Sequence, residues 1–359
     1  MSDTIEKTAV RPPAPAVRLR SRFWRGRDAT IVYALVLIVV LAALFIPYFA
    51  SVTTVSFLLI DAIPILLMAM PMALIIITGE IDLSVASTAG LSAATLGVLW
   101  QAGHGHTSIV AIFVICLVIG AACGAFNGFL VAVVGLPSLA VTIGTLALFR
   151  GLALVVIGDN AVADFPTAVT TFATSNIPGI GVPTVMIFVA IVVVIFGVIL
   201  HFTPFGRGLF ALGFSPEAAS FVGIRVNASK FWLYVASGVV SSAAGLFWVL
   251  RYSSAQSDSV QGLELSVVAA VLLGGVSIFG GSGSIVGVVA GVLIIRTVNY
   301  SLQLAGLPDT VLTIVTGGLL VLSVVAPSIT ARVRVLREQR ARARDLGAPA
   351  PAPTGAPAS

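Results

Sequence analysis

The chain has 359 residues, of which 58% are hydrophobic and 9% are charged, and its formal net charge is +5. Soluble proteins carry roughly 25% charged residues, so this composition excludes an ordinary soluble domain. The apolar runs are about 20 residues long, the length that a helix needs to cross the bilayer. We therefore expect an all-α polytopic membrane protein in contact with lipid, and we attribute the basic excess to membrane topology rather than to nucleic-acid binding.

Residues 1–28 are rich in Pro and Arg, and we expect them to form a disordered cytoplasmic tail. The first apolar run is longer than the core of a signal peptide, and more runs follow it, so we interpret it as a retained helix. About ten spans are predicted in a membrane domain of residues 29–328. Their expected ranges are 31–50, 57–78, 84–101, 108–134, 139–157, 184–202, 230–251, 265–280, 284–303 and 310–326.

The basic residues test this number of spans. Seven of the 19 precede the first span, three lie between Arg207 and Lys230, and six lie between Arg332 and Arg344. The ten predicted spans place all three clusters on one face, which the positive-inside rule makes cytoplasmic, whereas an odd number would put one terminal cluster on the other side. Both termini are then expected in the cytoplasm. Residues 329–359 are first basic and then rich in Ala and Pro, which predicts a solvated tail.

A polar break between two apolar runs contains Glu80, Asp82 and Ser84. It is either a plain turn at the cytoplasmic end or a partly unwound segment that lines a cavity, and the span count favours the turn. Asp61 lies within an apolar run, where a carboxylate must reach water or face protein. Its position near the start of the span favours an outer end that reaches water over a place on a transport pathway.

Three further polar side chains lie within the spans, namely Asn127, Thr142 and Thr145. They could offer hydrogen bonds to a polyol, although such side chains more often bond neighbouring helices. Together with Glu80, Asp82 and Ser84 they form the candidate substrate pathway.

Residues 203–230 form a polar, basic loop between two spans. Ser215 can cap a helix, Pro216 fits its first position, and Glu217 complements its positive end. This pattern predicts a short helix that runs through Ala218 and Ala219 towards Gly223. It is either a contact to a cytoplasmic partner or an ordinary solvated loop helix.

Short sequences recur in the two halves of the chain. Gly-Leu-Pro and two later threonines are shared by 135–145 and 306–316, and Asp82-Leu-Ser-Val resembles Glu264-Leu-Ser-Val. Glycines four apart occur in both halves, at Gly120, Gly124 and Gly128 and at Gly283, Gly287 and Gly291. The glycines predict close helix packing. Each pair is five spans apart, so either the matches are chance or the fold is a 5+5 inverted repeat.

The sequence offers little for catalysis. Cys116 and Cys123 lie in one apolar run, and no set of His, Cys and carboxylates has metal or triad spacing. The glycine-rich run at 280–283 lacks the Lys-Ser/Thr ending of a nucleotide loop. We expect no metal, cofactor or ATPase site in this chain, and an intramembrane enzyme is disfavoured.

Four stretches resemble the permease subunits of bacterial ATP-binding-cassette importers for sugars of the ribose, xylose, rhamnose and autoinducer-2 type. They are TGEIDLSVAS at 78–87, GAFNGFLVAVVGLPSLAVTIGTLALFRG at 124–151, GRGLFALGFSPEAASFVGI at 206–224, and GLELSVVAAVLLGGVSIFGGSGSIVG at 262–287. The family commonly has glycine where this chain has Glu80, which leaves the identity of the substrate open.

The resemblance implies a multi-pass protein of the bacterial inner membrane that takes up a small sugar. It implies a second permease subunit, identical or different, an ATPase subunit that binds ATP and Mg, and an extracytoplasmic sugar-binding protein. The segment from Ser215 to Gly223 would be the coupling helix that contacts the ATPase. The alternative is an ion-coupled secondary transporter of a small polar solute, which inverted repeats and acids within the membrane would also suit.

Overall fold

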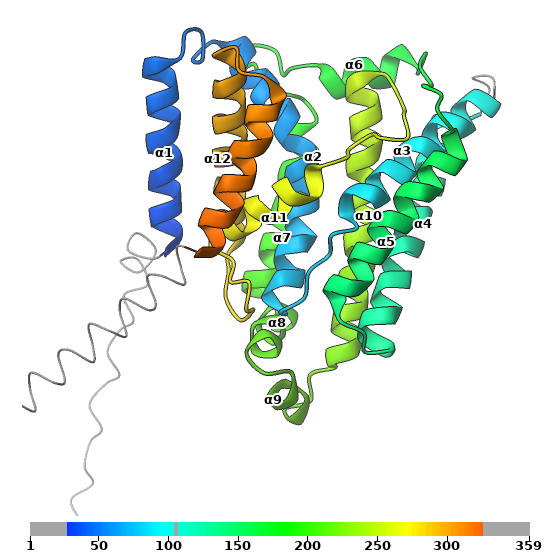
Figure 1. Cartoon of the computed structure of the whole chain (residues 1–359), viewed down its shortest axis with the longest axis vertical. Coiled ribbons are helices and arrows are strands. Elements are labelled where there is room, and N and C mark those ends of the chain that lie inside the picture. The colour runs from blue at the N-terminus through cyan, green and yellow to red at the C-terminus, as the bar shows by residue number, and fades with distance from the viewer. Residues whose placement is uncertain (1–26, 104–106, 326–359) are drawn as a thin grey trace, which may run out of the picture.

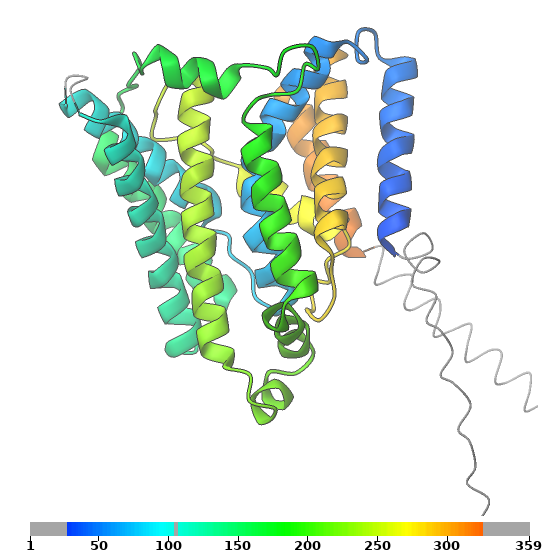
Figure 2. The same ribbon diagram turned by 180° about the vertical axis from the view of Figure 1, so that it is seen from behind.

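The computed structural model describes residues 27–103 and 107–325, and these residues form helices and loops (Figures 1 and 2). The predicted tails fall outside these ranges, except for residues 27 and 28, which begin the first helix. The labelled helices are α1 (Arg27–Phe45), α2 (Val52–Ile77), α3 (Val85–Ala102), α4 (Ile109–Gly128), the π-helix η3 (Phe129–Val133), α5 (Ser138–Ile157), α6 (Thr167–Thr174), α7 (Met186–Phe202), α8 (Pro204–Phe214), α9 (Pro216–Phe221), α10 (Val226–Tyr252), α11 (Leu263–Leu273) and α12 (Ile285–Leu304). A last helix covers Asp309–Val325.

Six of the described helices are long and apolar enough to cross a membrane. The number becomes seven if α7 and α8, which meet at a bend of 68°, form one broken span. The all-α polytopic class is therefore confirmed, whereas the number of ten spans stays a prediction. Two shorter apolar helices, α11 and Asp309–Val325, account for part of the difference.

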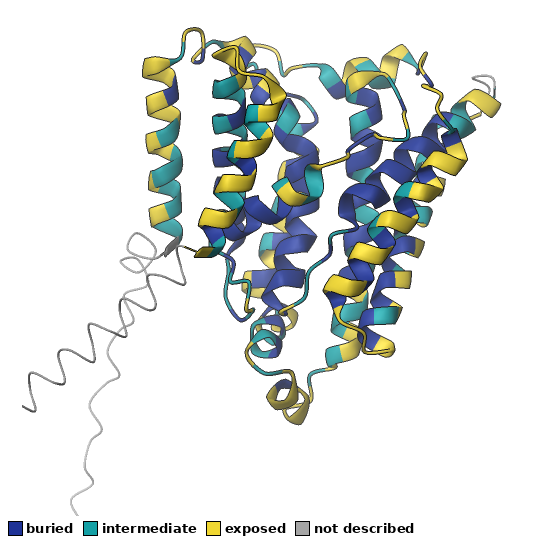
Figure 3. Ribbon diagram, viewed as in Figure 1, coloured by how far each residue is buried: buried dark blue, intermediate teal, exposed yellow. Residues whose placement is uncertain are grey.

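Helix α2 is the centre of the molecule. It is apolar on all sides, and 94% of its most apolar window is buried, because α7, α10, α11 and α12 pack around it (Figure 3). A helix that is hydrophobic all round belongs in an interior. In contrast, only 6% of the corresponding window of α1 is buried, and its exposed leucines and valines suit contact with lipid.

Two helices start inside the molecule rather than at one of its ends. Helix α3 follows the irregular segment 78–84, and α11 follows the loop 253–262 (Figure 1). The predicted span 265–280 is therefore too long, since α11 ends at Leu273. Glycines explain the early end: Gly275, Gly280 and Gly281 have φ between 74° and 85°, a region that other residues avoid. The repeated Asp/Glu-Leu-Ser-Val sequence thus begins a helix in each half.

Candidate functional site

Helix α9 projects from the end of the molecule at which α7 ends and α10 begins (Figure 1). The Ser215 hydroxyl accepts a hydrogen bond from the backbone N–H of Ala218 at 3.1 Å, so the helix starts where the sequence predicted. The same hydroxyl lies 3.0 Å from Glu217 Oε2 and donates to it. The helix is short, and Gly223 follows it with φ 85°.

Apolar side chains are exposed around α9. Phe214, Phe221 and Val222 are 80%, 90% and 76% exposed, although they lie in the charged loop between two long helices. Apolar patches of this kind mark interaction sites. The pKa of Glu217 is lowered by its own backbone N–H and by the Ser215 hydroxyl, with a smaller contribution from the positive charge of Lys230. This end of the molecule therefore presents exposed apolar side chains beside Glu217, whose ionised form is favoured.

The break between α2 and α3 is buried and not a solvated turn. Asp82 and Ser84 are 2% and 1% exposed. Asp82 Oδ1 accepts hydrogen bonds from the Ser84 backbone N–H at 3.0 Å and from the Ser84 hydroxyl at 2.6 Å. Its other oxygen accepts from the Ser237 hydroxyl at 2.8 Å, and Asn127 Nδ2 donates to Ser84 Oγ at 2.8 Å. Asp82 and Ser84 therefore do not lie in a plain solvated turn, because this carboxylate is satisfied inside the protein rather than by water.

The backbone of the break is satisfied by side chains. The Ile81 N–H donates to Ser138 Oγ at 3.2 Å, and the Ile81 carbonyl accepts from Tyr234 and from Thr142, both at 3.3 Å. Irregular backbone is tolerated at membrane depth only where protein or water supplies such partners. The candidate residue Thr142 therefore supports the break, and Asn127 bonds to the same segment.

Helix α10 contacts the break at three regularly spaced positions. Lys230 pairs with Glu80 at 2.5 Å, Tyr234 bonds the Ile81 carbonyl, and Ser237 bonds Asp82. Residues at i, i+4 and i+7 lie on one face of a helix, so one stripe of α10 follows the successive residues 80, 81 and 82. We call this set of contacts the α10 ladder. Because only four residues separate α9 from α10, the ladder connects the projecting helix to the buried carboxylate.

Thr145 lies apart from this network. Its hydroxyl donates to the carbonyl of Thr142 at 3.4 Å, within α5. Together with Leu130 and Pro137 it lines a groove of about 330 Å³ between η3 and α5. Of the six candidate pathway residues, five therefore belong to the break or contact it, and Thr145 faces a separate surface groove.

Five of the six predicted packing glycines lie at close helix crossings. A Cβ atom at Gly120 or Gly124 would collide with the backbone of α10, and one at Gly128 would lie 3.0 Å from the Phe231 carbonyl oxygen. In the second half, Gly287 and Gly291 face the backbone of α11 and Gly274, whereas Gly283 packs against Val276 and Ile77 side chains. These glycines let backbones approach where a side chain would not fit.

Three contributors to the network were not found from the sequence: the partner role of Lys230, the Tyr234 hydroxyl and the Ser237 hydroxyl. Each pairs with a residue about 150 positions away, and serines and tyrosines in apolar runs are too common to stand out. The i, i+4, i+7 spacing is the one signal that could have grouped them. Within the described ranges, no group of three or more His, Cys, Asp and Glu residues is placed to hold a metal ion.

Similarity to known proteins covers most of the chain. The family model described as "Branched-chain amino acid transport system / permease component" matches residues 54–324. The "Autoinducer 2 import system permease protein LsrD" of Salmonella paratyphi B is 34% identical over 330 residues, 90% of this chain and 98% of that protein. The LsrD of Escherichia coli O9:H4 is 36% identical over 288 residues, 79% of this chain and 86% of that protein. No solved structure matches significantly.

The matched residues extend from the start of α2 into the helix Asp309–Val325, so they include α9, the break and the α10 ladder. The family match therefore covers the described membrane domain apart from α1. The chain belongs to this family of permease components, and it is a transmembrane permease of an ATP-binding-cassette importer.

Proposed function

We propose that this permease imports a small sugar or sugar-like polyol, delivered by an extracytoplasmic binding protein, and that α9 is its coupling helix. An ATPase subunit, which binds ATP and Mg, would dock on the exposed side chains Phe214, Phe221 and Val222. The observation that carries the proposal is the α10 ladder, because it joins the docking end of the chain to a buried polar segment.

The proposed topology has ten crossings, with α9 and both termini in the cytoplasm. In it, α3 and α11 each complete a crossing together with the irregular segment before them, and α7 with α8 counts once. The 5+5 inverted repeat is supported by α3 and α11, which both start inside the molecule at or beside the related Asp82 and Glu264 sequences. A pathway at the interface of inverted halves is the arrangement that such repeats produce in transporters.

A second permease subunit would complete the pathway. Helix α5 exposes Leu139 and Ile143 on one face, and the groove beside Thr145 opens on the same helix. We propose that this face meets the partner permease, whether identical or different. The relatives named for autoinducer-2 import support a sugar-like substrate, and their import function does not favour the ion-coupled alternative.

The test compares two exposed alanines at opposite ends of the molecule. In proteoliposomes with the ATPase and binding protein, Ala218→Trp on α9 should abolish ATP-dependent uptake without loss of membrane insertion. Ala168→Trp on α6 is the matched control and should leave uptake unchanged, since both positions are exposed. Equal uptake by the two variants would contradict the docking of an ATPase at α9. Uptake driven by an ion gradient without the ATPase would contradict the importer proposal.

A further inference from the structure

A small charged cavity lies between α2, α10, α11 and α12, away from the α10 ladder. It has a volume of about 70 Å³ and is lined by Asp61, Arg251 and Arg296 together with Trp248, Tyr252 and Leu263. One water needs only about 10–15 Å³ measured in this way, so the cavity can hold a group of several heavy atoms. It lies towards the end of the molecule at which α2 begins and α10 ends (Figure 1).

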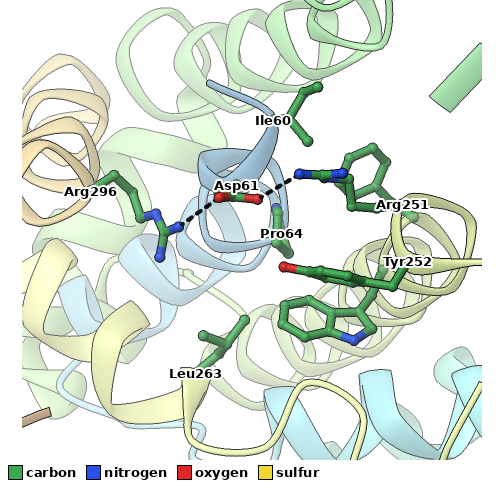
Figure 4. A pocket seen from close by; sticks show the side chains of 9 residues that line it. Ile60, Asp61, Pro64, Arg251, Tyr252, Leu263 and Arg296 are labelled. Carbon is green, nitrogen blue, oxygen red and sulfur yellow. Dashed lines mark ion pairs between the residues drawn. The ribbon is translucent and has the colours of Figure 1, made fainter. Parts of the chain in front are cut away.

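The charges in this cavity do not balance. Asp61 lies between the two guanidinium groups, 3.7 Å from Arg251 Nη2 and 3.4 Å from Arg296 Nη2 (Figure 4). Among the described residues, no other carboxylate lies within ion-pair distance of either arginine. The cluster therefore carries one net positive charge inside an apolar bundle. An uncompensated ion there is costly unless a counter-charge or water reaches it.

The arginines also have unused hydrogen-bond donors. Both contacts to Asp61 are longer than the roughly 2.7–2.9 Å of a tight charge-assisted hydrogen bond. The Nε atoms of Arg251 and Arg296 are buried and have no hydrogen-bond partner within residues 27–103 and 107–325. The side of a guanidinium that carries Nε is one of the edges that bind a carboxylate or phosphate through two parallel bonds.

Arg150, in the same protein, is an arginine whose donors are bonded to backbone carbonyls. Its Nη1 donates to the carbonyls of Ser257 and Ser259 at 3.0 and 2.9 Å, and its Nη2 donates to the carbonyl of Ala86 at 3.5 Å. It holds the 253–262 loop on α3 through neutral acceptors. Among the described residues, no backbone carbonyl accepts a hydrogen bond from Arg251 or Arg296. A purely structural role therefore explains Arg150 better than it explains Arg251 and Arg296.

The walls of the cavity keep Arg251 in place and leave an entrance. The Arg251 guanidinium lies 5.4 Å from the ring centres of Phe57 and Tyr252, which orients it by cation–π contact. Trp248 and Tyr252 pack with ring centres 4.7 Å apart. The side chains of Asp61, Arg251 and Arg296 are each 18–20% exposed, so a small solute can reach them.

We infer that this cavity binds one small oxyanion, a carboxylate or phosphate group, between the Arg251 and Arg296 guanidiniums. Asp61 then acts as the internal anion that occupies the arginines until the ligand arrives. The two anions compete for the same donors. The inference that the cavity binds an oxyanion does not depend on the proposed function. Only the further step, that the oxyanion is part of a transported solute, would rest on it.

The test measures anion-dependent thermal stability of the purified full-length chain in phosphatidylcholine nanodiscs. Inorganic phosphate and acetate are added against chloride at equal ionic strength. Both oxyanions should raise the melting temperature more than chloride does. Arg251→Gln and Arg296→Gln should each weaken the response by roughly tenfold or more in anion concentration, the size expected for one lost charge-assisted contact. Arg150→Lys, outside the cavity, is the matched control and should keep the wild-type response.

Asp61→Asn decides between a binding site and a structural clamp. Removal of the competing carboxylate should tighten the response to phosphate, even if the ligand-free variant melts at a lower temperature. A clamp predicts the opposite: lower stability of Asp61→Asn and no oxyanion effect beyond chloride in any variant. That outcome would overturn the inference.

Two further arms identify the source of the oxyanion. If phosphatidylglycerol in the nanodisc removes the response to added phosphate, the ligand is a lipid headgroup; if the response persists, it is a free solute. Both results support an oxyanion site. Uptake by the assembled importer is measured separately, so ATP-dependent uptake of a neutral sugar with no anion response would sink this inference and leave the proposed function standing.

Discussion

Lys230 Nζ lies 2.5 Å from Glu80 Oε1, which joins the second turn of α10 to the segment between α2 and α3. The two side chains are 15% and 17% exposed, so the pair is largely shielded from water. Of the three contacts in the α10 ladder, this ion pair is the nearest to α9 along the chain.

Loss of this ion pair should uncouple the break from α10. Glu80→Gln or Lys230→Gln should each lower the free energy of unfolding by about 1–3 kcal/mol, between the values of exposed and buried pairs, and should reduce uptake. The exchange Glu80→Lys with Lys230→Glu should recover part of both losses. A double-mutant cycle on melting and uptake checks this, and strictly additive effects would contradict a direct coupling.

Two serines on α10 separate hydrogen bonding from packing. Ser237→Ala removes one partner of the buried Asp82 and should cost about 1–3 kcal/mol. Ser241 is the matched control, because it is fully buried on the same helix and its hydroxyl has no hydrogen-bond partner. Ser241→Ala should be neutral or slightly stabilising. Thermal unfolding in detergent measures both, and equal losses would argue against a specific role for Ser237.

Two helix glycines should respond in opposite ways to alanine. A Cβ at Gly124 would collide with the Tyr234 carbonyl, so Gly124→Ala should separate α4 from α10 and cost about 1–3 kcal/mol. Nothing lies within 4 Å of a Cβ at Gly144 in α5, so Gly144→Ala should stabilise the isolated chain by up to about 1 kcal/mol. The comparison of the two melting temperatures is the measurement. Destabilisation by Gly144→Ala would show that the face of α5 is already covered.

The cap of α9 gives a pH-dependent prediction. Because the pKa of Glu217 is lowered in the folded chain, the stabilisation from its ionised form is present above the ordinary pKa of glutamate. It is lost as the pH falls through the lowered value. Ser215→Ala removes a donor to Glu217 and the N-cap, so it should raise this pKa and cost about 1 kcal/mol of helix stability. A carboxyl-selective NMR titration checks this; an unchanged Glu217 titration would contradict it.

Local features of the fold could be predicted from the sequence. Some helix ends agree closely with the predicted ranges, as in 310–326 against Asp309–Val325 and 139–157 against Ser138–Ile157, because apolar run length is a local property. The start of α9 followed from the capping pattern of Ser215, Pro216 and Glu217. The early end of α11 could not be placed, since apolar content continues past Leu273 while the backbone changes direction at glycines.

The site was predicted only in part, because its contacts are distant in sequence. Asp82 and Ser84 were recognised as a polar break, but whether they face water or protein depends on Ser237 and Asn127. Asp61 was expected to reach water at an outer end, and in the structure it is held between Arg251 and Arg296. These pairings depend on which helices pack against one another. Periodicity along the sequence does not specify that packing.

The crossing of α4 and α10 has mechanical consequences. Gly120 and Gly238 face one another with bare backbone on both sides, and beside them the Ser242 hydroxyl donates to the Cys116 carbonyl at 2.8 Å, so the two backbones are held in direct contact. A shift of α10 along α4 would have to break this hydrogen bond, so we expect the two helices to move together at this crossing. In the proposed role of α9 as the coupling helix, a force on α9 would then be transmitted through α10 to residues 80–82.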